Sequence, residues 1–260
     1  MGKSLIGAEI AATRENGVTR AQVRELREEL ERERAEGRER ERQLERYASD
    51  LSDIFKAERR RSDQLRDSYV ATVRALTNAV EARDAYTGKH AERVASYGLE
   101  LARRISPALA ADPQTEFGFL LHDVGKVAIP DDVLHKAGDL TETEEALMRR
   151  HPEIGQEIVA HIRFLDTASL TVRYHHERWD GGGYPDGLAE RDIPLAARIF
   201  AVGDALDAIT TDRPYRPGVT FAAARTEIEA AAATQFDPTV VEALDHIPDE
   251  LLERLRAQTG

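Results

Sequence analysis

The stretch LLHDVGK, residues 120–126, places a histidine and an aspartate on consecutive positions directly after an apolar run. The apolar residues before the pair predict that His122 and Asp123 lie at the floor of a pocket. Buried imidazoles and carboxylates are costly unless they have partners, and one divalent cation can satisfy several of them. Five more residues with metal-binding side chains lie in the same helix-rich part of the chain: His90, His151, His175, His176 and Asp204. Taken together, these residues favour a metal-dependent hydrolase.

The sequence around this pair, from Tyr69 to the C-terminus, has the pattern of an all-α domain. Proline and glycine interrupt it regularly, and the segments between them have helical periodicity without a clear alternating strand pattern. Thr141, with Glu144 three residues later, predicts a capping box at the start of one helix. Asp237 before Pro238 predicts the start of another helix. One apolar stripe at helical spacing consists of Val70, Val73, Leu76 and Val80.

Residues 20–68 predict a long charged helix, which we call the stalk. Glu and Arg dominate this segment, which has no proline and a single glycine, Gly37. We expect a coiled coil and a parallel homodimer through this helix, because a long helix without an apolar partner is marginal in water. The alternative is a solvated single helix supported by i,i+4 Glu–Arg pairs. Residues 1–19 are expected to be flexible. The apolar residues at coiled-coil spacing are Val23, Leu26, Leu30, Leu44, Tyr47, Leu51, Ile54 and Leu65.

The composition excludes several classes of protein. The net charge of -12 disfavours binding to duplex nucleic acid, but metal ions and a few arginines can still attract a small anionic substrate to one pocket. There is no cysteine, so a disulfide framework and a thiolate metal site are excluded, and a cytoplasmic location is expected. No apolar run approaches the roughly 18 to 20 residues that cross a bilayer. The N-terminus also lacks the apolar region of a signal peptide.

The spacing of the candidate ligands favours two metal ions. Consecutive helical residues point about 100° apart, so His175 and His176 are not expected to hold one small ion together. They could serve two ions a few ångströms apart, or one could bind an ion while the other contacts substrate. A carboxylate such as Asp123 can bridge two ions, and two divalent cations roughly 3.5 to 4 Å apart commonly promote phosphodiester cleavage. Ligands with nitrogen and oxygen but no sulfur suit Mn, Fe, Ni or Zn. Three other histidines are expected on the surface or on a helix face: His135, His161 and His246.

As a set, these motifs resemble the HD-GYP domain, a subgroup of the HD phosphohydrolases. The motifs are HDVGK at residues 122–126 and HHERWDGGGYP at residues 175–185, together with RDAYTGKH at residues 83–90 and RPYR at residues 213–216. The resemblance covers about Glu81 to Asp237 and extends to the whole domain of residues 69–260. It implies an all-helical HD-type fold. It also implies hydrolysis of the bacterial second messenger cyclic di-GMP to pGpG, and commonly on to GMP, by a hydroxide that two metal ions activate.

The resemblance also implies how the metal ligands are shared between two divalent ions. One ion would be surrounded by His90, His122, Asp123 and Asp204. Asp123 would bridge to a second ion, held by His151, His175 and His176. Some members of the family bind a third ion through a glutamate four residues before the first histidine, but this chain has Tyr86 there. We therefore expect two ions, with Asp84 orienting His90.

Substrate-binding roles follow from the same resemblance. Lys126 would contact the scissile phosphate and act with Asp123 in catalysis. Arg213 and Arg216 would hold a substrate phosphate, for which a guanidinium fork is suited. Their alternative role is a structural ion pair with Asp207 or Asp212. Tyr184 would either contact substrate or only pin the glycine-rich loop. That loop is also expected to touch partner proteins.

Three functions are compatible with these features. The first is an active cyclic di-GMP phosphodiesterase. The second is a sensor that binds the nucleotide, or docks a diguanylate cyclase or another regulatory partner, without turnover. The third is an HD hydrolase for another cyclic dinucleotide. The complete set of candidate ligands favours the first.

Overall fold

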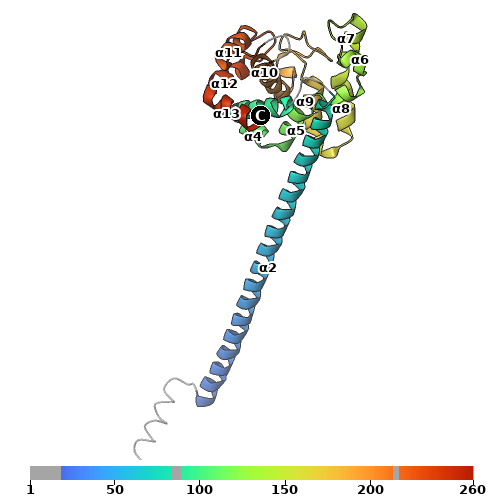
Figure 1. The fold of residues 1–260 in the computed structure, drawn as a ribbon. Coiled ribbons are helices and arrows are strands. Elements are labelled where there is room, and N and C mark those ends of the chain that lie inside the picture. The colour runs from blue at the N-terminus through green and yellow to red at the C-terminus, as the bar shows by residue number, and fades with distance from the viewer. Residues whose placement is uncertain (1–18, 84–88, 213–216, 260) are drawn as a thin grey trace, which may run out of the picture. The chain divides into compact units, whose positions relative to one another are not determined.

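Helices and short loops make up the part of the chain that the computed structural model describes, residues 19–83, 89–212 and 217–259 (Figure 1). Within these ranges, β-type pairing is limited to two isolated bridges, Asp180 with Ala189 and Ala232 with Phe236. The predicted all-α fold is therefore confirmed. The helices are α2 (Arg20–Glu81), α3 (His90–Ile105), α4 (Pro107–Ala111), α5 (Pro113–Leu120), α6 (Asp131–Leu134), α7 (Glu142–Met148), α8 (His151–Ala160), α9 (Asp166–Tyr174), α10 (Leu195–Thr210), α11 (Phe221–Ala230), α12 (Pro238–Asp245) and α13 (Asp249–Thr259). The short 3₁₀ turns are η1 (Val124–Ala128), η2 (Arg163–Leu165) and η3 (Glu190–Asp192).

Helix α2 is longer than the predicted stalk. The contacts within the chain define two units, Met1–Arg66 and Asp67–Gly260, and α2 continues through this division to Glu81. Side chains of residues 20–66 are exposed, whereas Val73 and Thr77 near the end of α2 are buried in the second unit. The apolar stripe of residues 70–80 is thus part of the same helix, because no helix-breaking residue separates it from the charged segment.

The core of the second unit forms where α3 and α10 pack together. Both helices present apolar faces to it, and α5 and α9 pack on each other beside them. Burial of these faces provides the main driving force for folding this unit. The fully buried residues at this crossing include Val94, Leu101, Phe119, Phe200 and Leu206.

Gly98 and Gly203 lie where α3 and α10 cross. A Cβ atom on Gly203 would lie 3.4 Å from the backbone nitrogen of Gly98, an ordinary contact distance, whereas a Cβ atom on Gly98 would lie 2.7 Å from the ring of Phe119 in α5. A larger residue at position 98 would therefore overpack α3 against α5. The crossing of α3 and α10 places His90, the first residue of α3, beside Asp204 in α10.

Gly125 in η1 brings two other parts of the chain together. A Cβ atom at this position would lie 1.9 Å from the carbonyl oxygen of His151, so only glycine permits this approach of η1 to α8. Asp123 directly precedes η1, and His151 is the first residue of α8. The contact therefore sets the distance between these two candidate ligands.

The predicted helix starts are confirmed. The Thr141 side chain and the Glu144 carboxylate form the capping box at the start of α7. Asp237 accepts a hydrogen bond from the backbone nitrogen of Thr239 at 2.8 Å at the start of α12, and it also pairs with Arg198. Among the described residues, no helix is both long and apolar enough to span a membrane.

Candidate metal centre

Five histidine rings form a connected cluster in the second unit. The distances between ring centroids are 5.6 Å for His90–His122, 5.3 Å for His122–His175, 5.2 Å for His151–His175, 5.1 Å for His151–His176 and 4.2 Å for His175–His176. The rings come from separate elements, namely the starts of α3 and α8 and the turns after α5 and α9. The fold thus brings together the five histidines that the sequence singles out.

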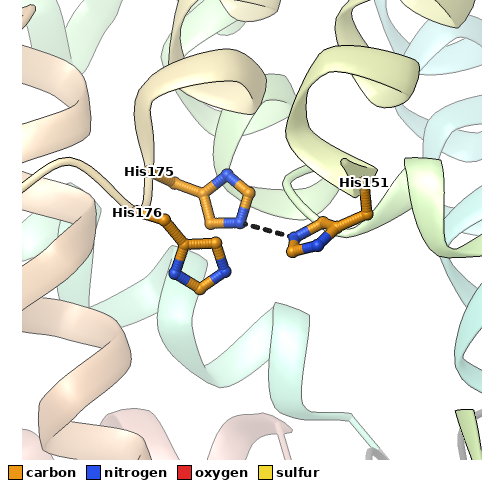
Figure 2. A group of neighbouring side chains, drawn as sticks. All are labelled: His151, His175 and His176. Carbon is orange, nitrogen blue, oxygen red and sulfur yellow. Dashed lines mark hydrogen bonds between the residues drawn. The ribbon is translucent and has the colours of Figure 1, made fainter. Parts of the chain in front are cut away.

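The backbone holds three of these rings in one tautomer. Nδ1 of His122, His151 and His175 lies 2.9, 2.8 and 2.8 Å from the carbonyl oxygen three residues earlier in the chain. A carbonyl oxygen only accepts, so Nδ1 carries the hydrogen and Nε2 of the neutral ring keeps its lone pair. The Nε2 atoms of His151 and His175 lie 3.2 Å apart (Figure 2). In the neutral rings these two acceptors face each other, an arrangement that a cation between them would stabilise.

His151, His175 and His176 can hold one ion together. Their ligand atoms lie within 4.8 Å of one another, and the three rings are neighbours in the structure (Figure 2). The expectation that His175 and His176 point too far apart to share an ion is therefore wrong. It assumed helical geometry, but α9 ends at Tyr174 and both histidines lie in the turn that follows.

Asp123 lies between the histidines and Lys126. Its Oδ2 atom is 3.0 Å from Nε2 of His122 and 2.8 Å from Nζ of Lys126, and its Oδ1 atom is 3.3 Å from Nε2 of His151. Burial alone would raise the pKa of Asp123, but the charges of His122 and Lys126 outweigh it and hold the pKa well below its ordinary value. This carboxylate stays ionised and directs one oxygen to His122 and the other to His151, which is a suitable geometry for a bridging ligand.

His90 is held by two carboxylates from α10. Its Nε2 atom is 3.3 Å from Oδ1 of Asp204, and its Nδ1 atom is 2.7 Å from Oδ2 of Asp207. Asp207 also binds Arg93, whose Nε atom lies 2.6 Å from Oδ1. Burial alone would lower the pKa of His90, but the hydrogen bonds to Asp204 and Asp207 raise it to about 10.

Asp207 and Arg93 are site residues that the sequence does not single out. The available signal is the i,i+3 spacing of Asp204 and Asp207, which places both carboxylates on one face of α10. The sequence instead predicts Asp84 as the residue that orients His90. In the structure, Asp207 contacts Nδ1 of this ring directly.

Part of the predicted site lies outside the described residues, namely Asp84, Arg213 and Arg216. The phosphate-binding role of the two arginines therefore stays a prediction. Three histidines for which no ligand role is expected have exposed side chains away from the cluster: His135, His161 and His246.

The glycine-rich loop covers one side of the cluster. The ring of Tyr184 stacks on His176, with 4.7 Å between centroids and 22° between planes, and the guanidinium of Arg149 lies 5.1 Å from the Tyr184 centroid. Burial raises the pKa of Tyr184 to about 12, so its hydroxyl stays neutral. The buried carboxylate of Glu177, a residue that the sequence does not single out, accepts hydrogen bonds from the backbone nitrogens of Asp186 and Leu188 at 2.8 and 3.1 Å. These bonds pin the loop and hold Tyr184 over His176.

The donor atoms fit divalent transition-metal ions. Imidazole nitrogens and carboxylate oxygens converge, and the chain has no cysteine to supply sulfur. This combination suits Mn, Fe, Ni or Zn. The fixed tautomers support the same conclusion, because a ring that donates through Nδ1 presents Nε2 as the metal-binding atom.

Comparisons with known proteins identify the family to which the chain belongs. The HD domain family matches residues 74–240 of the chain. The 3'3'-cGAMP-specific phosphodiesterase 2 of Vibrio cholerae is 41% identical over 190 residues, which cover 72% of this chain and 36% of that protein. The cyclic di-GMP phosphodiesterase response regulator RpfG of Xanthomonas campestris is 42% identical over 175 residues, which cover 66% of this chain and 46% of that protein. The chain thus spans between about a third and a half of the length of these curated relatives.

A solved structure has the same fold. The crystal structure of a cyclic GMP-AMP specific phosphodiesterase of Vibrio cholerae aligns with a TM-score of 0.51 and 18% sequence identity, covering 72% of this chain and 54% of that chain. At this identity the likeness concerns the fold alone. The chain belongs to the HD domain family, and its resemblance to the HD-GYP subgroup is confirmed.

Proposed function

We propose that this protein is a metal-dependent phosphodiesterase that hydrolyses cyclic di-GMP, with pGpG or GMP as the final product. The observation that carries the proposal is the convergence of five histidines with Asp123 and Asp204 in one partly buried cluster. Relatives named cyclic di-GMP phosphodiesterases, at 36 to 42% identity, support the choice of substrate.

The residues can divide their roles between two divalent cations. His90, His122 and Asp204 would hold one, and His151, His175 and His176 the other, with Asp123 shared. Two such cations would lower the pKa of a water molecule and neutralise charge on the phosphate.

Other residues would handle the substrate. Lys126 lies 2.8 Å from Asp123 and is in position to donate a hydrogen bond to a phosphate oxygen. Tyr184 offers an aromatic face beside His176 on which a guanine can stack. Arg213 and Arg216 would bind a phosphate.

A turnover assay tests the proposal. Purified full-length protein, loaded anaerobically with Mn or Fe, should convert cyclic di-GMP to pGpG or GMP, and metal analysis should find two ions per chain. The double variant His122→Ala/Asp123→Ala should lose this activity. His161→Ala is the matched control, because this histidine is exposed and outside the cluster. Tight nucleotide binding without product under every metal would instead indicate a sensor.

A second candidate substrate is 3'3'-cGAMP. It is favoured by the relatives named 3'3'-cGAMP-specific phosphodiesterases, which are 33 to 41% identical to this chain. Comparison of kcat/KM for cyclic di-GMP, 3'3'-cGAMP and guanosine tetraphosphate separates the candidates. A preference of tenfold or more for 3'3'-cGAMP would replace cyclic di-GMP as the proposed substrate.

We also propose that the stalk forms a parallel coiled-coil homodimer. The apolar side chains along it are exposed in the single chain, with Leu44 at 68% and Leu51 at 54%. Light scattering of the full-length protein should give a dimer, and Leu44→Glu/Leu51→Glu should shift it toward monomer. A monomeric wild-type protein at micromolar concentration would contradict the dimer.

The proposed substrate also suggests a location and partners. Cyclic di-GMP is an intracellular messenger, so the enzyme would act in the cytoplasm. The glycine-rich loop would be a surface for a diguanylate cyclase or another regulatory partner.

A further inference from the structure

The N-terminus of α3 receives its cap from another helix. His90 is the first residue of α3, and the residue before it, Lys89, has a left-handed backbone with φ of 61° and forms no side-chain cap hydrogen bond. Instead, Oε1 of Glu81, the last residue of α2, accepts a hydrogen bond from the backbone nitrogen of Ala91 at 2.9 Å. A carboxylate at this position satisfies a free N–H group and is stabilised by the helix dipole.

Arg83, two residues after Glu81, contacts the segment that follows Asp123 and Lys126 in the chain. Arg83 donates through Nη1 to the carbonyl oxygen of Val127 at 2.6 Å and through Nη2 to that of Ile129 at 3.2 Å. Its Nη2 atom also lies 2.6 Å from Oδ1 of Asp131. These groups belong to residues 127–131, the segment after Lys126. Arg83 therefore fixes the end of the turn that begins at Asp123.

A pocket lies beside the contact of Glu81 with Ala91. It encloses about 330 Å³, part of it open to solvent, and its lining includes Glu81, His90, His122, Asp123 and Lys126. The end of α2 therefore forms a wall of the same space that His90 and Asp123 enter.

We propose that Glu81 and Arg83 are positioning residues through which the end of α2 sets the geometry of the metal centre. Glu81 fixes His90 by capping α3, and Arg83 fixes the turn of Lys126 and of Asp123, the ligand that the two ions would share. The contact of Glu81 leads to a ligand of one ion only, so its loss changes that ion site more than the other. Because α2 is continuous with the stalk, a partner that twists the stalk can alter activity through these two residues. This inference rests on the proposed metal centre.

The central experiment compares variants of the full-length protein in which different contacts of α2 are removed. Glu81→Ala removes the cap, whereas Glu81→Gln keeps an oxygen that can accept from Ala91. Arg83→Lys keeps the charge but loses the fork that joins two carbonyls. The control is Arg74→Ala, because Arg74 also links α2 to α3 and α5, through Glu92 at 3.5 Å and Glu116 at 3.3 Å. Neither of these partners lines the pocket, whereas Ala91 and Lys126, which Glu81 and Arg83 contact, do.

The first readout is hydrogen exchange in the metal-free protein. Glu81→Ala should speed exchange of the Ala91 amide and its neighbours at least tenfold, whereas Arg74→Ala should leave this peptide unchanged. This readout does not depend on turnover. Equal exchange in Glu81→Ala and wild type would overturn the assigned cap.

The second readout is metal affinity, resolved into its two binding steps with Mn or Zn. Loss of a group that orients a ligand typically costs about 10- to 100-fold in affinity or activity. Glu81→Ala should weaken one step by about that factor and leave the other unchanged, whereas Arg83→Lys should weaken both steps because Asp123 is shared. In both variants kcat should fall more than KM rises. Glu81→Gln should recover most of the affinity.

Two outcomes would overturn the proposal at this stage. One is equal weakening of both steps by Glu81→Ala, and the other is an equal effect of Arg74→Ala, since either would indicate that the contacts only support the fold. The proposed function fails separately, if the wild-type protein loads two ions, shows these differences and turns over no cyclic dinucleotide.

Discussion

The two halves of the histidine cluster have opposite electrostatic character, although the same residue type dominates both. On one side, two carboxylates bind His90 and raise its pKa to about 10, so this ring is charged at neutral pH without a metal. On the other side, burial lowers the pKa of His175, and lowers that of His176 to about 4, with the neighbouring imidazoles adding to the effect. These rings are neutral and present free lone pairs.

This difference shows that the neighbouring groups, and not the residue type, determine the charge of each imidazole. The charge in turn determines whether a proton must leave before a metal ion can bind. We call the part around His90, Asp204 and Asp207 the carboxylate-rich half, and the part around His151, His175 and His176 the imidazole-rich half. The carboxylate-rich half already holds positive charge on His90 and Arg93. A metal ion there must displace a proton. In the imidazole-rich half, His175 and His176 are neutral, and a metal ion there meets their free lone pairs. The halves should therefore respond differently to mutation and to pH.

The largest effect is expected from Asp123→Ala, because this carboxylate contacts both halves. Its loss removes a ligand from each proposed ion, which is worth several kcal/mol of transition-state stabilisation. Turnover of cyclic di-GMP should fall by roughly 10³-fold or more. Initial-rate assays with saturating Mn measure this. If an excess of metal restored wild-type turnover, Asp123 would not be the shared ligand.

The second largest effect is the loss of one bound metal ion, which distinguishes the two halves of the cluster. His90→Ala and His176→Ala should each reduce the bound metal from two ions to one per chain, since loss of a ligand exceeds the roughly 10- to 100-fold cost of losing a ligand's partner. Equilibrium dialysis followed by metal analysis tests this. Exposed His246→Ala is the control and should still bind two. If either variant lost both ions, the two halves would be one inseparable site.

A smaller effect is expected from Asp207→Asn. The amide cannot supply the charge that Asp207 shares between His90 and Arg93, so His90 loses its fixed orientation. Activity should fall by about 10- to 100-fold, and only the metal-binding step of the carboxylate-rich half should weaken. Asp245→Asn, at an exposed position, is the control. Weakening of both steps would show that Asp207 supports the fold as a whole.

The sequence alone predicts the all-α fold from its helical periodicity. It predicts the seven candidate ligands from the joint occurrence of histidines and aspartates, and their roles from motifs that resemble the HD-GYP domain. Helical periodicity does not predict that His175 and His176 can contribute to one ion site, since that depends on α9 ending at Tyr174. Helix ends shift by a residue or two with tertiary context. The roles of Asp207 and Glu81 are also missed. They depend on which helices cross, and that is set by contacts between residues far apart in the chain, such as Gly98 and Gly203.

The smallest expected effect is on the pH dependence of stability in the metal-free protein. The native pKa of His90 exceeds the unfolded value of about 6.5, so its stabilising effect is complete below that pH and is lost as the pH rises toward 10. For His176 the native pKa is about 4, so the unfolded chain binds the extra proton and stability rises between pH 4 and 6.5. Each slope is at most about 1.4 kcal/mol per pH unit.

Urea unfolding of chelator-treated protein at a series of pH values tests both slopes. His90→Gln should flatten the profile above pH 6.5 only, and His176→Gln below it only. His161→Gln, at an exposed position, should leave the profile unchanged. If both variants flattened the same side, the two halves would share one electrostatic environment. The metal-free protein would then not contain a charged His90, held by carboxylates, beside His175 and His176 that burial keeps neutral.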